Sequence, residues 1–272
     1  AAGIGWVRFD MNWFQFEPAK GQFDWTIADR FVGTADALGL GIFVTVAYTP
    51  EWAVGHPCDD GAEDSGDHCL NAVPANPGDW TDFVAAAVAR YGDRVRHWGM
   101  WNEPNLDHFF QGTRDEYVNE ILIPGSQTVH SVCPDCLVLG PELANLREVH
   151  WDAEEGDCFE IGCSFNGWNH SLMRILQDAG DHIDIITHHK YTDPADLWWY
   201  EVLDGEWILI QIMWGAKEIT DEHAPGKPVW LTEFGWHSQP WGEYSDEYAA
   251  EQLTAIYDGM CRVSAGDYEG PY

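Results

Sequence analysis

Two glutamates have neighbours that suit them to acid–base and nucleophilic chemistry. Glu103 lies within Trp101–Asn105 (WNEPN), and Glu233 lies within Leu231–Trp236 (LTEFGW). Each follows a short apolar run that is typical of a buried strand. A carboxyl group at the end of a buried strand is costly unless it is hydrogen-bonded or used. Such a pair can supply one acid that donates a proton and one carboxylate that attacks.

Short apolar runs rich in β-branched or aromatic residues predict six buried parallel strands. These runs are Gly5–Phe9, Ile42–Ala47, Val95–Trp101, Leu137–Gly140, Ile183–Thr187 and Val229–Thr232. Amphipathic segments predict helices over Thr26–Leu38, Trp80–Tyr91, Thr113–Val132, Leu172–Ala179, Trp207–His223 and Asp246–Val263. Asp79 is the predicted N-cap of the second helix, and Gly39 and Gly180 are predicted C-cap glycines.

The alternation of strands and helices predicts an α/β protein with right-handed strand–helix–strand units. A doubly wound open sheet and a TIM (β/α)8 barrel both have this pattern. No G-x-G-x-x-G follows the first strand, so the dinucleotide-binding form of the open sheet lacks its fingerprint. Polar and aromatic residues instead follow the strands, where a barrel has its active site. We therefore expect a single catalytic barrel domain over residues 1–272.

A closed barrel has eight strand–helix units, and only six are found here. We expect either that the first and last units lie outside this stretch of sequence or that further strands are hidden. The segments 143–168 and 192–206 are long enough to contain hidden strands.

The chain is strongly acidic, with 46 Asp and Glu against 13 Lys and Arg and a formal net charge of −33. Such a surface repels nucleic acid, anionic lipid and polyanionic sugars, and it favours neutral or cationic ligands. No apolar run reaches 18 residues, which argues against a membrane span. The N-terminal AAGIGWVRFD has neither the basic nor the apolar region of a signal peptide.

Six of the seven cysteines form pairs that are close in sequence. The pairs are Cys58 with Cys69, Cys133 with Cys136, and Cys158 with Cys163. Structural zinc and thioredoxin-like redox chemistry are alternatives, but only one C-x-x-C is present where a four-cysteine zinc site usually draws on two. We expect three loop disulfides and hence a secreted, extracellular protein. Cys261 is left over, with no predicted partner.

The two glutamate motifs resemble those of the clan A glycoside hydrolases, which are retaining (β/α)8 enzymes. In that clan an Asn-Glu-Pro ending the fourth strand carries the acid/base, and a glutamate ending the seventh strand is the nucleophile. WNEPN followed by Phe109 and Phe110 is most similar to glycoside hydrolase family 39, with the family 5 cellulases next. The resemblance implies Glu103 as acid/base and Glu233 as nucleophile, with no cofactor and no metal.

The resemblance also implies supporting residues. Asn102 resembles the clan asparagine that binds the sugar 2-hydroxyl, and Arg8 resembles an arginine near the nucleophile. His189 and Tyr191 share one face of a strand and resemble the clan His-x-Tyr, whose tyrosine hydrogen-bonds the nucleophile. From the residues alone, an ion pair between Arg8 and Asp10 and a buried core role for His189 remain open.

Aromatic side chains at strand ends are candidates for stacking on sugar rings. Trp52 and Trp236 are the preferred ones among the 16 tryptophans, with core packing as the alternative for each. On the clan pattern, the first strand here corresponds to the second of the family and the last to the seventh. The eighth strand of the family commonly carries an aromatic platform under the sugar, and that platform has no candidate here.

These observations predict a retaining β-glycosidase, xylosidase-like or glucanase-like, that acts on a poly- or oligosaccharide by double displacement. A non-catalytic carbohydrate-binding pseudo-enzyme on the same barrel is the main alternative. A metal-dependent hydrolase is less favoured, because H-E-x-x-H is absent and the adjacent His188 and His189 point to opposite faces of a strand. We expect a carbohydrate as partner and a monomer by default. The sugar, the linkage and endo or exo cleavage are not indicated.

Overall fold

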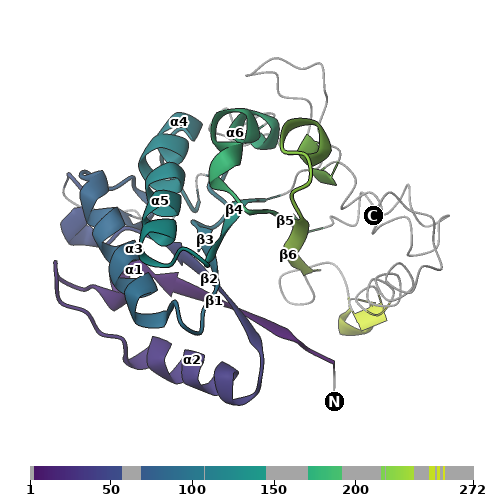
Figure 1. The fold of residues 1–272 in the computed structure, drawn as a ribbon, viewed down its shortest axis with the longest axis horizontal. Helices are drawn as coiled ribbons and strands as arrows, with labels where there is room; N and C mark the ends of the chain where they lie inside the picture. The colour runs from purple at the N-terminus through teal and green to yellow at the C-terminus, as the bar shows by residue number, and fades with distance from the viewer. Residues whose placement is uncertain are drawn as a thin grey trace.

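Parallel strands in the chain order form one curled sheet. The computed structural model describes residues 3–56, 69–106, 108–144, 171–191, 216–217, 219–235, 245–248, 250–251 and 254. The six strands are β1 (Trp6–Asn12), β2 (Gly41–Ala47), β3 (His97–Met100), β4 (Leu137–Leu143), β5 (Ile185–Tyr191) and β6 (Val229–Gly235). Figure 1 shows this sheet as a partial barrel with helices along its outer side. All six predicted strands are present, and the partial TIM barrel is confirmed.

Helices connect the strands and cover the outer face of the sheet (Figure 1). They are α1 (Trp13–Phe16), α2 (Thr26–Ala37), α3 (Pro77–Tyr91), α4 (Arg114–Glu116), the π-helical η3 (Tyr117–Leu122), α5 (Ile123–Val132) and α6 (Ser171–Ala179). Short 3-10 turns are η1 (Glu51–Ala53), η2 (Cys69–Asn71) and η4 (Gly180–His182). Helix α2 packs on β1 and β2, and α5 packs on β3 and β4. Within the described residues, no helix has the length and apolar character needed to span a membrane.

The ends of the helices carry capping residues of the expected types, but two of the predicted caps are wrong. Asn76 is the N-cap of α3 because its side chain accepts a backbone N–H, so the predicted cap Asp79 is wrong and lies in the first turn. Thr113 begins α4 with a complete capping box. Gly39 has φ +67 after α2, as predicted for a C-cap glycine. Gly180 has no such φ and begins η4, so its predicted role is wrong.

An aromatic layer fills the space between α3 and the sheet. Trp13 stacks on Phe83 with ring centroids 5.7 Å apart, and Trp80 contacts both Trp13 and Trp101. The Trp80 indole donates to the carbonyl of Ile121 at 3.0 Å, so its polar atom is satisfied. Burial of each ring stabilises the fold by roughly 2–3 kcal/mol. This layer fixes the outer side of β3, whose end carries Glu103.

The two outer strands of the sheet approach each other through side chains at their amino ends. Trp6 on β1 meets Trp230 on β6 with ring centroids 5.2 Å apart, and His97 on β3 contacts both rings. Gly41 makes room for this cluster, since a Cβ there would lie 2.6 Å from the Trp6 ring. The sheet is therefore curled enough for its first and last strands to share one interior.

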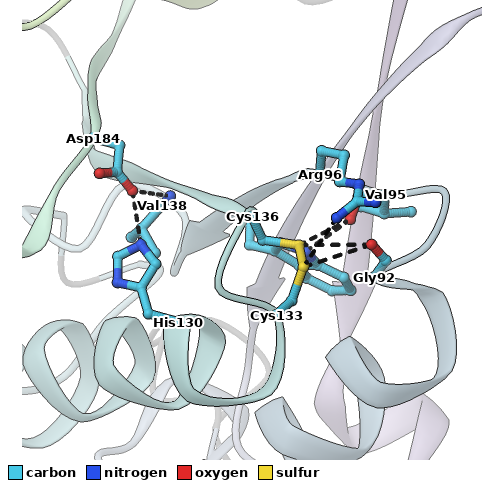
Figure 2. Close-up of a disulfide and its surroundings, with 9 residues drawn as sticks. Gly92, Val95, Arg96, His130, Cys133, Cys136, Val138 and Asp184 are labelled. Atoms are coloured by element: carbon cyan, nitrogen blue, oxygen red, sulfur yellow. Dashed lines mark hydrogen bonds and ion pairs between the residues drawn. A yellow bond between two sulfur atoms is a disulfide. The ribbon is translucent and has the colours of Figure 1, made fainter.

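A disulfide between Cys133 and Cys136 joins the end of α5 to the start of β4, with an S–S distance of 2.07 Å. Figure 2 shows the bond beside Gly92 and Arg96, and Arg96 Nη1 donates to Cys133 Sγ at 3.4 Å. Cys69 is also disulfide-bonded. The other cysteines of the predicted pairs, Cys58, Cys158 and Cys163, lie outside the described residues, as does Cys261.

Candidate active site

Glu103 and Glu233 meet at the carboxyl edge of the sheet. Glu233 lies on β6, and Glu103 follows the end of β3. One carboxyl oxygen of each and one ring nitrogen of His189 all lie within 4.8 Å of one another. Retaining glycosidases hold their two carboxyl groups about 5 Å apart. This upper bound on the approach of the two carboxyl groups is compatible with direct displacement at a sugar carbon.

Arg8 on β1 connects the residues of this cluster. Its guanidinium donates to Glu233 Oε2 at 2.7 Å and to Asn102 Oδ1 at 2.6 Å. Its Nε donates to Asp10 Oδ1 at 3.0 Å, and its Nη2 lies 3.4 Å from Glu142 Oε2. Burial alone would lower the pKa of Arg8, but the three carboxylates outweigh burial and raise it. The structure therefore contains both the contact with Glu233 and the ion pair with Asp10.

His189 on β5 lies between the carboxylates and is fully buried. Its Nδ1 is 2.9 Å from Glu103 Oε1 and 3.5 Å from Glu233 Oε2, and its Nε2 is 3.3 Å from Glu142 Oε2. Burial alone would lower the pKa of His189, but hydrogen bonds with Glu103 and Glu142 raise it to about 9. Its protonated form therefore stabilises the fold fully below about pH 6.5, and this contribution is lost as the pH rises through about 9.

Glu142 is a buried carboxylate that the sequence motifs did not identify. It is 0% exposed and accepts hydrogen bonds from Thr45 Oγ1 at 3.1 and 3.3 Å. It lies two residues past the predicted end of its strand at Gly140, and the observed strand β4 extends through it to Leu143. The only available signal was a glutamate directly after a buried strand, the same signal that identified Glu103 and Glu233.

Two irregularities in strand pairing aim side chains into the site. The β4–β5 register shifts between Pro141 and Leu143, which leaves Glu142 in the irregular position. The β5–β6 register shifts so that His189 pairs with Glu233. Bulges re-aim side chains at barrel rims. Here they turn a buried carboxylate and an imidazole toward the same point.

Strained backbone marks the same edge of the sheet. Four non-glycine residues among those described have positive φ: Tyr48 (70°), Trp101 (78°), Glu103 (43°) and Glu142 (54°). They lie at the carboxyl ends of β2, β3 and β4. Each such conformation costs on the order of 1–3 kcal/mol and persists only where its surroundings enforce it. The coincidence of strain with the carboxylate cluster supports a functional site.

The two asparagines of WNEPN have different roles. Asn102 accepts from Arg8 and donates to the Tyr48 hydroxyl at 3.3 Å, so its amide is held beside the cluster. Burial raises the pKa of Tyr48 to about 12, which keeps this hydroxyl neutral. Asn105 exchanges two hydrogen bonds of 2.9 Å with the backbone of Ala144. It thereby joins the loop after β3 to the end of β4.

The remaining predicted site residues are placed differently. Trp52 packs edge-on against Trp13, and its indole donates to the Glu17 carbonyl at 2.8 Å. These contacts are those of core packing, and its sugar contact stays a prediction. The backbone of Tyr191 pairs with Gly235 on β6, two residues beyond the pair of His189 with Glu233. Trp236 lies outside the described residues.

Gly99 on β3 leaves the space that Glu142 occupies. A Cβ at this position would lie 2.0 Å from Glu142 Oε1 and 2.9 Å from the Phe43 ring. We expect Gly99→Ala to lower the free energy of unfolding by about 1–3 kcal/mol, because a packed interior must shift. Urea unfolding monitored by circular dichroism measures this change.

Gly33→Ala is the matched control for this substitution. Gly33 lies in α2, and a Cβ there meets nothing within 4 Å. Alanine at such a helical position is expected to stabilise by about 0.4–1 kcal/mol. Equal effects of the two substitutions would contradict the tight fit around Glu142.

Comparisons with known proteins agree with this fold. No protein-family model matches the chain. A β-xylosidase of Geobacillus stearothermophilus is 23% identical over 267 residues, which are 90% of this chain and 47% of that protein. A family 39 β-xylosidase structure from Caulobacter crescentus has a TM-score of 0.60 at 21% identity, over 92% of this chain and 52% of that one. A glucosidase structure from Croceicoccus marinus has a TM-score of 0.63 at 17% identity, over 89% and 44%.

The chain spans about half the length of the curated relatives that it matches. The sequence match nevertheless covers 90% of this chain, and the structural match covers 92% of it and supports the fold of the partial barrel. In sequence and fold, the chain therefore resembles the β-xylosidases of glycoside hydrolase family 39, within clan A.

Proposed function

We propose that this chain hydrolyses β-glycosidic bonds with retention of configuration. Glu103 is the general acid/base and Glu233 is the nucleophile. The observation that carries the proposal is the approach of their carboxyl oxygens, within 4.8 Å, at the carboxyl edge of the partial barrel. Two carboxyl groups at this spacing leave no room for a water between them, which favours double displacement over inversion.

The contacts of each glutamate suit its proposed role. In the first step Glu233 attacks the anomeric carbon while Glu103 gives its proton to the departing oxygen, so the glycosidic C–O bond breaks as the glycosyl ester forms. Arg8, 2.7 Å from Glu233, favours the ionised nucleophile. In the second step Glu103 takes a proton from water, the water oxygen attacks the same carbon, and Glu233 is released.

The substrate that we propose is a β-xyloside or a related neutral β-linked oligosaccharide. The named relatives support xylose, because the proteins from Geobacillus stearothermophilus and Caulobacter crescentus are β-xylosidases. The net charge of −33 supports a neutral glycan, since a polyanionic sugar would be repelled. Asn102, held by Arg8 and Tyr48, is placed to bind a sugar hydroxyl near the two glutamates.

Aryl β-glycosides test this proposal directly. We expect release of p-nitrophenol from the β-xyloside, and proton NMR should show the β-anomer of the sugar as the first product. The α-anomer as first product would contradict double displacement. Release from no member of a xyloside, glucoside, mannoside and galactoside panel would favour a binding protein instead.

Metal-assisted hydrolysis is disfavoured by the charges of the site. The nitrogen of His189 and the oxygens of Glu103 and Glu233 lie close enough to surround a cation. Arg8 already occupies an oxygen of Glu233, however, and the raised pKa of His189 keeps its ring protonated near neutral pH. We expect EDTA to leave hydrolysis unchanged, whereas loss of activity that zinc restores would overturn this assignment.

We also propose an extracellular location for this protein. The bonded pair Cys133–Cys136 and the bonded state of Cys69 support an oxidising compartment. Recovery of the protein solely from the cytosolic fraction of its source cells would contradict the proposal.

A further inference from the structure

We propose that Glu142 is a positioning residue for this site, whose buried carboxylate holds Arg8 and His189 in place and keeps His189 directed at Glu103. This inference rests on the proposed function. Glu142 belongs to neither glutamate motif, and the double displacement makes no use of it. Its carboxylate is fully buried, so its charge must be compensated by the groups around it.

The first step concerns the contact between Arg8 and His189. Arg8 Nη1 lies 3.1 Å from His189 Nε2. When both ring nitrogens carry protons, this contact joins two donors and is repulsive. Glu142 Oε2 lies 3.3 Å from the same Nε2 and 3.4 Å from Arg8 Nη2. One carboxylate oxygen is therefore shared by both cations and compensates their repulsion.

The second step concerns the direction of the imidazole. With Glu142 accepting from Nε2, the other nitrogen, Nδ1, faces Glu103 Oε1 at 2.9 Å. Nδ1 of the protonated ring donates to Glu103 Oε1, and this oxygen can accept whether Glu103 is ionised or carries its proton on its other oxygen. Both protonation states of the acid/base thus find a partner without rotation of the ring. A carboxylate that fixes a histidine in this way is a recurring device in catalysis.

The third step concerns the charged groups around the His189 imidazole, which determine its pKa. The charged and titratable groups around it are Arg8 and Asp10 from β1, Tyr48 after β2, Glu103 after β3, Tyr117 from η3 beside Glu142, Glu142 from β4, and Glu233 from β6. Two of them, Glu103 and Glu142, hydrogen-bond the ring and raise the pKa of His189 to about 9 against the effect of burial. Without the Glu142 charge, Nε2 is expected to lose its proton and accept from Arg8 instead.

Nitrogen NMR of the imidazole ring tests this inference without relying on activity. In the wild type we expect both ring nitrogens of His189 to be protonated at pH 7.5, with a titration midpoint near 9; His189→Gln identifies the signal. In Glu142→Gln the midpoint should fall by about 1 pH unit or more. The alkaline limb of kcat/KM should move to lower pH as well, because the coupled His189–Glu103 pair binds its proton more weakly.

Glu17→Gln is the matched control, because Glu17 is another buried carboxylate. It accepts from the Trp13 indole and the Gly21 amide, both at 2.6 Å. This variant is expected to leave the His189 midpoint unchanged. If Glu142→Gln does not fold, Glu142→Asp replaces it in the test. This variant keeps the charge but shortens the side chain, so we expect a smaller fall in the His189 midpoint.

A neutral His189 ring in the wild type at pH 7.5 would overturn the inference, and so would an unmoved midpoint in both Glu142 variants. A lowered midpoint in a protein that hydrolyses no glycoside would instead leave the positioning role intact and refute the proposed function. The two hypotheses can therefore fail separately.

Discussion

Replacing Glu233 with alanine is expected to lower kcat by about 10⁴-fold or more, because the first covalent step loses its nucleophile. Azide should restore turnover, since it is small enough to attack the anomeric carbon from the vacated side. A single displacement of a β-glycoside inverts that carbon, so the product should be the α-glycosyl azide. Proton NMR coupling constants distinguish the α-glycosyl azide from the β-glycosyl azide.

Replacing Glu103 with alanine is expected to have a different signature. The loss should be about 10²- to 10⁴-fold for poor leaving groups, which need a proton, and smaller for activated aryl glycosides. Azide then attacks the glycosyl ester on Glu233, so two inversions give the β-glycosyl azide. Glu120→Gln, on η3, removes another carboxylate and serves as the control with unchanged turnover. The same azide anomer from both variants would refute the assignment of roles.

Arg8→Lys is the third substitution with a large expected effect. The fork of Arg8 donates at once to Glu233, Asn102, Asp10 and Thr45, and a single ammonium cannot reach these acceptors together. We expect kcat/KM to fall by about 10²-fold or more, because both the nucleophile and Asn102 lose their orientation. Steady-state kinetics on the aryl β-xyloside measures this loss.

Arg8→Ala should also destabilise the fold, by about 3–5 kcal/mol, since it leaves the buried charge of Glu142 with one cation fewer. Chemical unfolding at pH 7 measures this difference. Arg90→Lys is the control, because Arg90 makes a two-pronged ion pair with Asp29 on the surface. Exposed pairs contribute little. Similar losses from Arg8 and Arg90 variants would show that the charge network in the site has no special importance.

The positions of Glu103 and Glu233 could be predicted because each ends an apolar run, and the carboxyl ends of parallel strands meet at one edge. The resemblance to the clan A enzymes implied Arg8, Asn102 and His189 as their neighbours, and the structure brings these residues together. For Arg8 the two interpretations, a partner of the nucleophile and an ion pair with Asp10, are both present in one hydrogen-bond network. From the sequence they were alternatives, because a sequence does not show how many hydrogen-bond acceptors lie within reach of one guanidinium group.

The sequence analysis missed Glu142 for a physical reason, although a glutamate after an apolar run was visible. Strand alternation assigns faces with a period of two residues, and a register shift between Pro141 and Leu143 interrupts that period. Its nearest contacts, Arg8, Thr45 and His189, are distant in sequence and become neighbours only when the sheet curls. Trp52 illustrates the opposite case, where an aromatic residue after a strand serves packing against Trp13.

The meeting of Trp6 and Trp230 provides an optical signal for the curvature of the sheet. Indole rings at this separation couple their electronic transitions, so the pair should contribute an exciton couplet to the far-ultraviolet circular dichroism spectrum. The couplet arises only when the first and last strands are brought together, and both rings lie at the amino ends of their strands, whereas the carboxylate cluster lies at the carboxyl edge. Loss of this couplet in the Trp6→Phe variant would therefore show that the two rings meet in the wild type. The measurement detects the curling of the sheet without any assay of catalysis.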